Sequence, residues 1–282
     1  MSVAQRAVPL RPGLLRLIQV LLPILVLCLW QLAARNPDIA FFFGEPRKVA
    51  GQLWTWFSSG DGTLPVGPGR DVWFTLHFPA LIYPHLLVTL AETGMAFVIG
   101  TTLGSAVGLW LALAPRSARV LQPYLKAANA MPRVILAPIF ATWFGLGLLS
   151  KVALAVTLVF FVVFFNVYQG VREVSPVILA NARMLGATPR ALLRTVYLPS
   201  AMSWLFSSLH NAVGLAFVGA VIGEYLGAAR GIGYLIEQAE GTFDINAVIA
   251  GIVVLTAFAL ALDALVGRIE QRLMVWHPTR TL

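Results

Sequence analysis

The sequence predicts an all-α membrane protein with six transmembrane helices and with both termini in the cytoplasm. Hydrophobic residues make up 59% of the 282 residues and charged residues only 11%, whereas a soluble domain carries about a quarter charged residues. Six apolar segments are long enough to cross a bilayer, which takes about 20 residues. Lys and Arg collect between alternate segments, so the net charge of +8 is explained by membrane topology and not by binding to nucleic acid.

The apolar segments give the expected positions of the spans. They are residues 14–34, 85–114, 128–148, 152–169, 201–226 and 245–267. The fourth is the clearest, because it contains an unbroken run of aliphatic and aromatic residues. The first lacks a small-residue cleavage site, so we expect it to be a retained span and not a cleaved signal peptide.

The positive-inside rule orients these spans. With the N-terminus inside, 14 of the 20 Lys and Arg residues are cytoplasmic. The inside residues are Arg6, Arg11, Arg16, Arg116, Arg119, Lys126, Arg133, Arg172, Arg183, Arg190, Arg194, Arg268, Arg272 and Arg280. Arg35, Arg47, Lys48, Arg70, Lys151 and Arg230 are then outside.

The long segment between the first two spans is expected outside the membrane. Residues 46–57 have the pattern of a short amphipathic helix lying in the interface, anchored by Trp54, Trp56 and Phe57. Residues 60–70 are rich in Gly and Pro and are predicted to be a loop. The chain therefore divides into an N-terminal span with this external segment (1–84) and a core domain of five spans (85–282).

Residues 171–199 form a cytoplasmic loop that is much longer than a turn between helices requires. Two helical patches flank Gly186-Ala187-Thr188-Pro189. Glycine commonly ends a helix, and Thr followed by Pro suits the start of the next one. The pattern predicts a helix-turn-helix hairpin, and long ordered loops of this kind are usually functional.

This hairpin carries the motif of a known family. Ala180-Asn181-Ala182, then Gly186-Ala187, then Leu198-Pro199 have the spacing of the EAA loop in binding-protein-dependent ABC importer permeases. The blocks that begin at Met131 and at Gly223 resemble the branch that carries sulfonates, nitrate and taurine. The resemblance covers about two thirds of the chain. One feature departs from the family, since its glutamate is replaced by Ala180 and a carboxylate is therefore absent at that position.

The resemblance implies a type I ABC importer permease fold in the bacterial inner membrane. It implies a second permease copy, two cytoplasmic ATPase subunits and an external solute-binding protein, with a small, often anionic solute moved by alternating access. The expected ATPase-coupling residues are Ala180, Asn181, Ala182, Arg183, Gly186, Ala187, Thr188, Pro189, Arg190, Leu198 and Pro199. The chain contains no phosphate-binding loop, so no cofactor is expected on it and ATP with Mg²⁺ belongs to the partner.

Glycine spacing predicts close contact between helices. Gly100, Gly104 and Gly108 repeat at four-residue intervals, as do Gly219, Gly223 and Gly227. Small residues at this spacing let membrane helices approach closely.

Polar residues inside the apolar segments are candidates for a solute pathway or gate. They are Glu92, Asn166, His210, Asn211 and Glu224. Charged groups in a membrane are costly and are usually functional. We expect Glu224 to have a gate or entry role at the outer end of its span, Glu92 to pair with His85 or Arg133, and Asp263 to pair with Arg268.

Two other classes of protein fit less well. A secondary transporter or channel would lack the long hairpin and often contains inverted repeats. An enzyme would need a catalytic constellation, but the four histidines are scattered without metal-ligand spacing, and no catalytic or metal site is expected.

Overall fold

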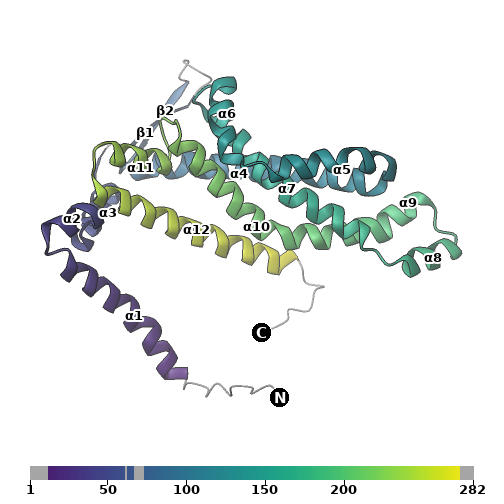
Figure 1. Ribbon diagram of the computed structural model, residues 1–282, viewed down its shortest axis with the longest axis horizontal. Coiled ribbons are helices and arrows are strands. Elements are labelled where there is room, and N and C mark those ends of the chain that lie inside the picture. Colours follow the sequence, from purple (N-terminus) through teal and green to yellow (C-terminus); the bar gives the residue numbers. More distant parts are fainter. Residues whose placement is uncertain (1–11, 61, 67–72, 274–282) are drawn as a thin grey trace.

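The computed structural model describes residues 12–60, 62–66 and 73–273. Four long helices run roughly side by side: α4 (Ile82–Leu113), α7 (Leu148–Arg172), α10 (Leu198–Tyr225) and α12 (Ile245–Leu273) (Figure 1). Helix α7 packs on both α4 and α10, and α12 contacts α10. The buried core follows from this arrangement, since Val159, Val163 and Val167 of α7 meet Ala96 of α4 and Ala216 of α10 in one cluster.

The two ends of the bundle differ. One end holds α2 (Pro37–Phe43), α3 (Pro46–Ser58), α6 (Leu136–Phe144) and α11 (Ile232–Gly241) with the strands β1 (Gly62–Val66) and β2 (Phe74–Phe78) (Figure 1). The other end holds α8 (Pro176–Met184) and α9 (Pro189–Leu192), beyond the long helices, and the start of α5 (Pro115–Ala130). A second core cluster, around Trp56, Ile82 and Ile232, joins α3, α4, α11 and α12.

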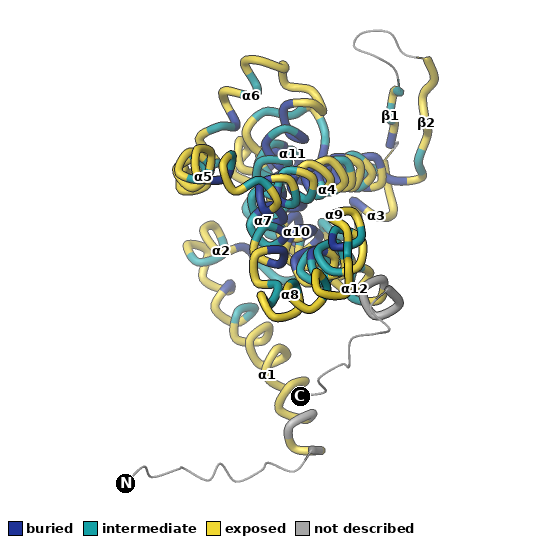
Figure 2. The backbone as a smooth tube through the Cα atoms, turned by 90° about the vertical axis from the view of Figure 1, so that its right-hand side faces the viewer, coloured by how far each residue is buried: buried dark blue, intermediate teal, exposed yellow. Residues whose placement is uncertain are grey.

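Four described helices are long and apolar enough to span a membrane, at Ile82–Leu113, Leu148–Arg172, Pro189–Tyr225 and Ile245–Arg268. They match the second, fourth, fifth and sixth predicted spans. Helix α1 (Pro12–Ala33) covers the first predicted span and stands apart from the bundle, with apolar side chains such as Leu22 and Leu25 exposed along it (Figure 2). An exposed apolar helix of this kind suits a lipid environment.

The continuous helix expected over 128–148 is wrong. Helix α5 (Pro115–Ala130) stops at Met131, whose extended backbone (ψ 134°) precedes Pro132. A residue before proline is pushed out of the helical region, and proline has no N–H to donate. A short 3-10 turn, η1 (Arg133–Ile135), then leads into α6, which ends at Gly145 with φ +76°.

The external segment is more ordered than its composition suggests. The predicted amphipathic helix is confirmed as α3, but Trp56 is only 6% exposed and packs in the core, so it does not serve as an interface anchor as expected, whereas Trp54 is exposed. The loop predicted over 60–70 is wrong for 62–66, which pairs antiparallel with 74–78 as β1 and β2, with Leu64 opposite Leu76. Aromatic residues in the second strand explain this pairing, because such residues favour strands.

Candidate functional site

The hairpin predicted from 171–199 is present and is built by local capping. The side chain of Ser175 accepts a hydrogen bond from the Val177 amide at the start of α8, and Thr188 accepts one from Ala191 at the start of α9, both at 3.3 Å. Each helix has Pro in its first turn. The start signals at Thr188 and Pro189 are therefore those that the sequence indicated.

Gly186 makes the turn between the two helices. Its φ is +81°, a left-handed conformation that favours glycine. Its N–H donates to Arg183 O and the Ala187 N–H donates to Ala182 O, each at 3.0 Å. These two bonds form a Schellman motif that satisfies the last carbonyls of α8.

The hairpin presents a mixed apolar and basic surface. Met184 and Leu185 are 78% and 88% exposed, and Val177 and Ile178 are also exposed. Ala180, Asn181, Arg183 and Arg190 are exposed on the same hairpin. An exposed cluster of large apolar side chains at the tip of an ordered loop is typical of a protein-binding surface.

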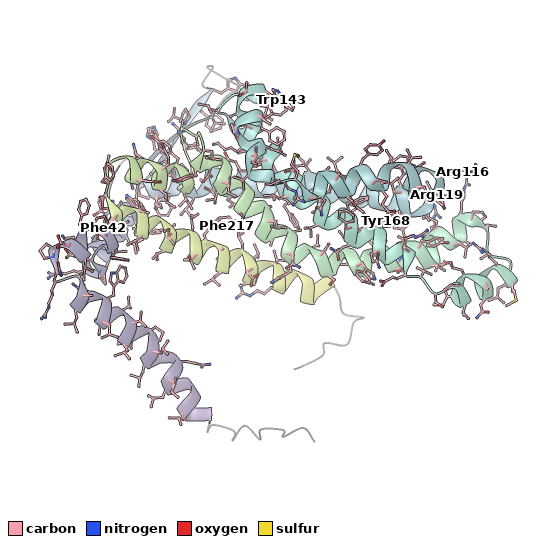
Figure 3. The ribbon with its side chains drawn as sticks, viewed as in Figure 1. Phe42, Arg116, Arg119, Trp143, Tyr168 and Phe217 are labelled. Atoms are coloured by element: carbon pink, nitrogen blue, oxygen red, sulfur yellow. The ribbon has the colours of Figure 1, made fainter. Side chains whose placement is uncertain are left out.

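The second arm of the hairpin runs directly into the bundle. After α9, residues Leu193–Tyr197 form a π-helical turn, η2, and Leu198 and Pro199 lie in the first turn of α10. Ser200 then ties α10 to α7 by donating to Gly170 O at 2.6 Å. The hairpin is thus mechanically continuous with a long helix. Arg116 and Arg119, at the start of α5, lie at the same end of the molecule (Figure 3).

A buried charge cluster lies toward the opposite end. It consists of His85, Thr89, Glu92, Lys151 and Glu224, which come from α4, α7 and α10. Lys151 Nζ lies 2.9 Å from Glu92 Oε1, and both side chains are at most 5% exposed. The expected partners His85 and Arg133 are therefore wrong for Glu92, and Lys151 is a buried partner instead of an exposed outside charge. A buried lysine requires such a partner because an unpaired charge is costly there.

Glu224 in this cluster holds the start of α11. Its Oε1 accepts from Thr89 Oγ1 at 2.6 Å and its Oε2 accepts from the Gly233 N–H at 2.8 Å. The Ile232 N–H donates to Thr89 Oγ1, and His85 Nδ1 lies 3.1 Å from the Gly231 amide nitrogen. The first amides of a helix have no partners within it, so these side chains supply them.

The glycines beside Ile232 are explained by the same contacts. A Cβ on Gly231 would lie 2.1 Å from Glu224 Cδ, and one on Gly233 would lie 2.6 Å from Val221 O. Gly231 also has φ +114°. The Gly-Ile-Gly sequence therefore allows the carboxylate to approach the backbone closely.

The remaining polar candidates do not join this cluster. His210 Nε2 lies 2.7 Å from Asp263 Oδ1 and links α10 to α12, so the expected pairing of Asp263 with Arg268 is wrong. Asn211 is exposed on α10. Asn166 on α7 donates to Val162 O of its own helix at 2.8 Å. The structure thus separates a closed cluster around Glu92 and Glu224 from an open polar region around His210.

Comparison with known proteins decides the family. Residues 80–275 match the family described as binding-protein-dependent transport system inner membrane component. The chain belongs to this family. It is therefore a permease subunit of an ABC importer in the bacterial inner membrane.

Individual relatives have different solutes in their names. The formylaminopyrimidine transport permease of Halalkalibacterium halodurans is 34% identical over 198 residues, covering 70% of this chain and 79% of that protein. The taurine transport system permease of Escherichia coli is 28% identical over 198 residues, covering 70% and 72%. A solved structure of an inward-facing methionine ABC transporter matches with TM-score 0.60 at 19% identity, covering 68% of this chain and 95% of that chain. This last likeness shows a shared fold.

Both glycine series of the permease lie at contacts within the chain. A Cβ on Gly100, Gly104 or Gly108 of α4 would lie within 3 Å of α7, for example 2.8 Å from Phe160 O at Gly104. A Cβ on Gly219 of α10 would lie 2.6 Å from Ala155 Cα, and one on Gly223 would lie 3.0 Å from Lys151 Cα. Gly227 lies beyond the end of α10, with φ +153°. These glycines let α7 fit closely between α4 and α10.

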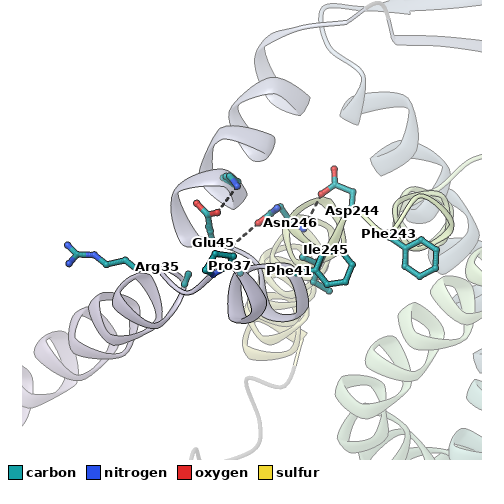
Figure 4. Close-up of a pocket in the computed structure, with 11 residues that line it drawn as sticks. Arg35, Pro37, Phe41, Glu45, Phe243, Asp244, Ile245 and Asn246 are labelled. Atoms are coloured by element: carbon teal, nitrogen blue, oxygen red, sulfur yellow. Dashed lines mark hydrogen bonds and ion pairs between the residues drawn. The ribbon is translucent and has the colours of Figure 1, made fainter.

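A polar pocket of about 430 Å³ lies where the N-terminal segment of the permease meets the core. Its lining includes Arg35, Glu45, Lys48, Asp244 and Asn246 (Figure 4). The Glu45 N–H donates to Asn246 Oδ1 at 2.8 Å, and Glu45 pairs with Lys48. This pocket is at the same end as α11, away from the hairpin.

Lys151 and Thr89 are the residues of the cluster that sequence reasoning missed. Lys151 lies at the boundary of an apolar segment, and hydropathy alone therefore places its charge in the outside loop. Spacing of three and four residues in a helix offers a signal, since His85, Thr89 and Glu92 recur on one face of α4.

Proposed function

We propose that the chain forms the membrane pathway of an importer that takes a small solute from an external binding protein and releases it into the cytoplasm. Two copies of the permease assemble as a homodimer with two ATPase subunits. ATP binding on the partners closes the cytoplasmic side and opens the outer side, and hydrolysis returns the complex to the inward-facing state.

The 171–199 hairpin carries this proposal. It extends beyond the long helices, exposes Met184 and Leu185, and continues into α10. Helix-in-groove recognition uses apolar anchors of this kind. The exposed Arg183, Arg190 and Arg194 supply charges for acidic groups on the ATPase, so docking does not require the carboxylate that Ala180 lacks.

The sides of the membrane follow from the same arrangement. The basic residues Arg116 and Arg119 share an end with the hairpin, which we assign to the cytoplasm. The end with α2, α3, α11 and the polar pocket of Figure 4 then faces outward and receives the binding protein. Helix α1 and the broken segment formed by α5, η1 and α6 complete six spans with both termini inside.

Co-purification with the ATPase tests the proposal. The permease and its candidate ATPase are expressed together, with an affinity tag on the ATPase, and the complex is isolated in detergent. We expect the wild-type chain to be retained and Met184→Asp/Leu185→Asp to be lost, because two carboxylates would replace the apolar anchors. Trp73→Asp is the matched control and should be retained, because Trp73 is 73% exposed, close to the 78% of Met184, and lies beside β2 at the end opposite the hairpin.

The competing hypothesis is a transporter that works without an ATPase. It predicts that both variants behave alike and that uptake persists when the ATPase is inactivated. The names of the relatives are compatible with three classes of solute for this importer, which are heterocycles, sulfonates and betaines.

A further inference from the structure

One face of α10 is polar and uncovered although it lies within a span. Ser207, His210, Asn211 and Gly214 are all exposed, and they fall on one side of the helix by their spacing. Polar side chains inside a membrane face protein or a water-filled path because lipid cannot satisfy them. This face therefore borders the solute path or the second copy.

A small pocket opens beside this face, between α10 and α12. Its volume is about 260 Å³, and Phe217 lies between the two helices (Figure 3). The pocket is lined by Val213, Gly214, Phe217, Thr256, Ala259, Leu260, Leu262 and Asp263. An apolar cavity of about 150 Å³ holds a benzene molecule, so this pocket has room for one substituted ring.

The charge at the pocket is unfavourable for an anion. Asp263 is its one charged lining residue among those described, and Asp263 is paired with His210. Lys151, the lysine buried in the span of α7, is paired with Glu92 in the separate cluster. A sulfonate would thus meet a carboxylate where it needs a cation, whereas a ring N–H or amino group would find an acceptor.

We infer that this pocket is a solute-contact site for an uncharged, planar heterocycle that carries hydrogen-bond donors. The inference rests on the proposed function and narrows its solute class. The ring lies against Phe217 and the aliphatic wall, and its polar edge faces Asp263 and Thr256. Ligand sites commonly combine such apolar walls with a few oriented polar groups.

Equilibrium binding tests the inference on the purified permease in lipid nanodiscs, with and without its ATPase. The probes are tritiated 4-aminopyrimidine, cytosine and adenine, with ethanesulfonate and glycine betaine as competitors. We expect saturable binding of at least one heterocycle and no competition by either charged compound.

Matched variants locate the site. A Cβ on Gly214 of α10 or on Gly94 of α4 meets no described neighbour within 4 Å, so leucine is sterically permitted at both positions. Only Gly214→Leu fills the pocket, and it should weaken binding more than about tenfold while Gly94→Leu does not. Thr256→Val should weaken binding severalfold, whereas Thr102→Val should not. Both threonine hydroxyls donate to carbonyls of their own helices.

The outcomes are separable. Displacement of a bound heterocycle by ethanesulfonate or glycine betaine overturns the solute class, as does binding of none of the heterocycles. Equal effects in the two glycine variants, or in the two threonine variants, show that the pocket is occupied by lipid or by the second copy. If the permease does not retain an ATPase, the proposed function is contradicted. Binding of a heterocycle to the permease alone still tests the pocket, because that measurement does not require the ATPase.

Discussion

The 171–199 hairpin and the buried charge cluster differ in the role of their glycines and in the burial of their charged side chains. In the hairpin, Gly186 provides a backbone conformation, and a side chain there would meet open space. In the cluster, Gly231 and Gly233 provide room for Glu224. The arginines of the hairpin are exposed, whereas Lys151 is buried against Glu92. Changes in the cluster should therefore affect the stability of the fold, and changes in the hairpin should affect coupling to a partner.

The largest effect is expected at Lys151. Lys151→Met removes the partner of Glu92 and leaves a buried carboxylate uncompensated, which costs about 3–5 kcal/mol in proteins. We expect a low yield and an unfolding midpoint well below that of the wild type, measured by thermal size-exclusion chromatography in detergent. The double variant Lys151→Met/Glu92→Gln should recover much of the loss. A single variant as stable as the wild type would show that the pair does not hold α4 to α7.

The next effect is expected where α4 meets α7. Gly104→Leu places a side chain against the backbone of Phe160, and overpacking of this kind costs about 1–3 kcal/mol. Because the contact is within one chain, the free energy of unfolding should fall first, before any change in oligomeric state. Gly94→Leu, on the same helix but facing open space, is the control. If Gly104→Leu and Gly94→Leu have similar unfolding midpoints, the face of α4 that carries Gly100, Gly104 and Gly108 does not pack tightly against α7.

A smaller effect on stability, but a large one on coupling, is expected at Gly186. Gly186→Val puts a β-branched residue at φ +81°, and the left-handed conformation costs about 1–2 kcal/mol for such a residue. The hairpin should deform while the spans stay intact, so the midpoint changes little but co-purification of the ATPase falls. Gly186→Asn should retain the ATPase, because asparagine tolerates this conformation. If Gly186→Val and Gly186→Asn retain the ATPase equally well, the left-handed turn at this position is not needed for ATPase docking.

The hairpin could be predicted from the sequence, whereas the partners in the buried charge cluster could not. The hairpin was predictable because its signals are local: Thr188, Pro189 and Gly186 determine caps within a few residues. The pairing of Glu92 with Lys151 joins positions 59 residues apart, and no local rule selects Lys151 over His85 or Arg133. The broken third span could not be predicted from hydropathy for a similar reason. The mean hydropathy of residues 128–148 contains no information about the helical hydrogen bond that Pro132 removes. Pairing of the strands across 67–72 depends on contacts that turn composition alone does not specify.

The smallest effect on stability is expected at Ala180. This residue is exposed on α8, and surface substitutions away from special contacts usually change stability by no more than about 0.5 kcal/mol. Ala180→Glu adds a carboxylate on the hairpin near Arg183 without filling a packed site. The unfolding midpoint should therefore match that of the wild type, and any change should appear in ATPase association. Stronger co-purification would indicate that the ATPase groove presents a cation or an N–H to this position, and weaker co-purification would indicate apolar or acidic contact.

Ala182→Glu is the matched control, since Ala182 is less exposed and its carbonyl accepts from Ala187 in the turn. If Ala180→Glu lowers the midpoint as much as Ala182→Glu does, Ala180 packs against protein in the assembled membrane complex and does not lie at the edge of a docking surface.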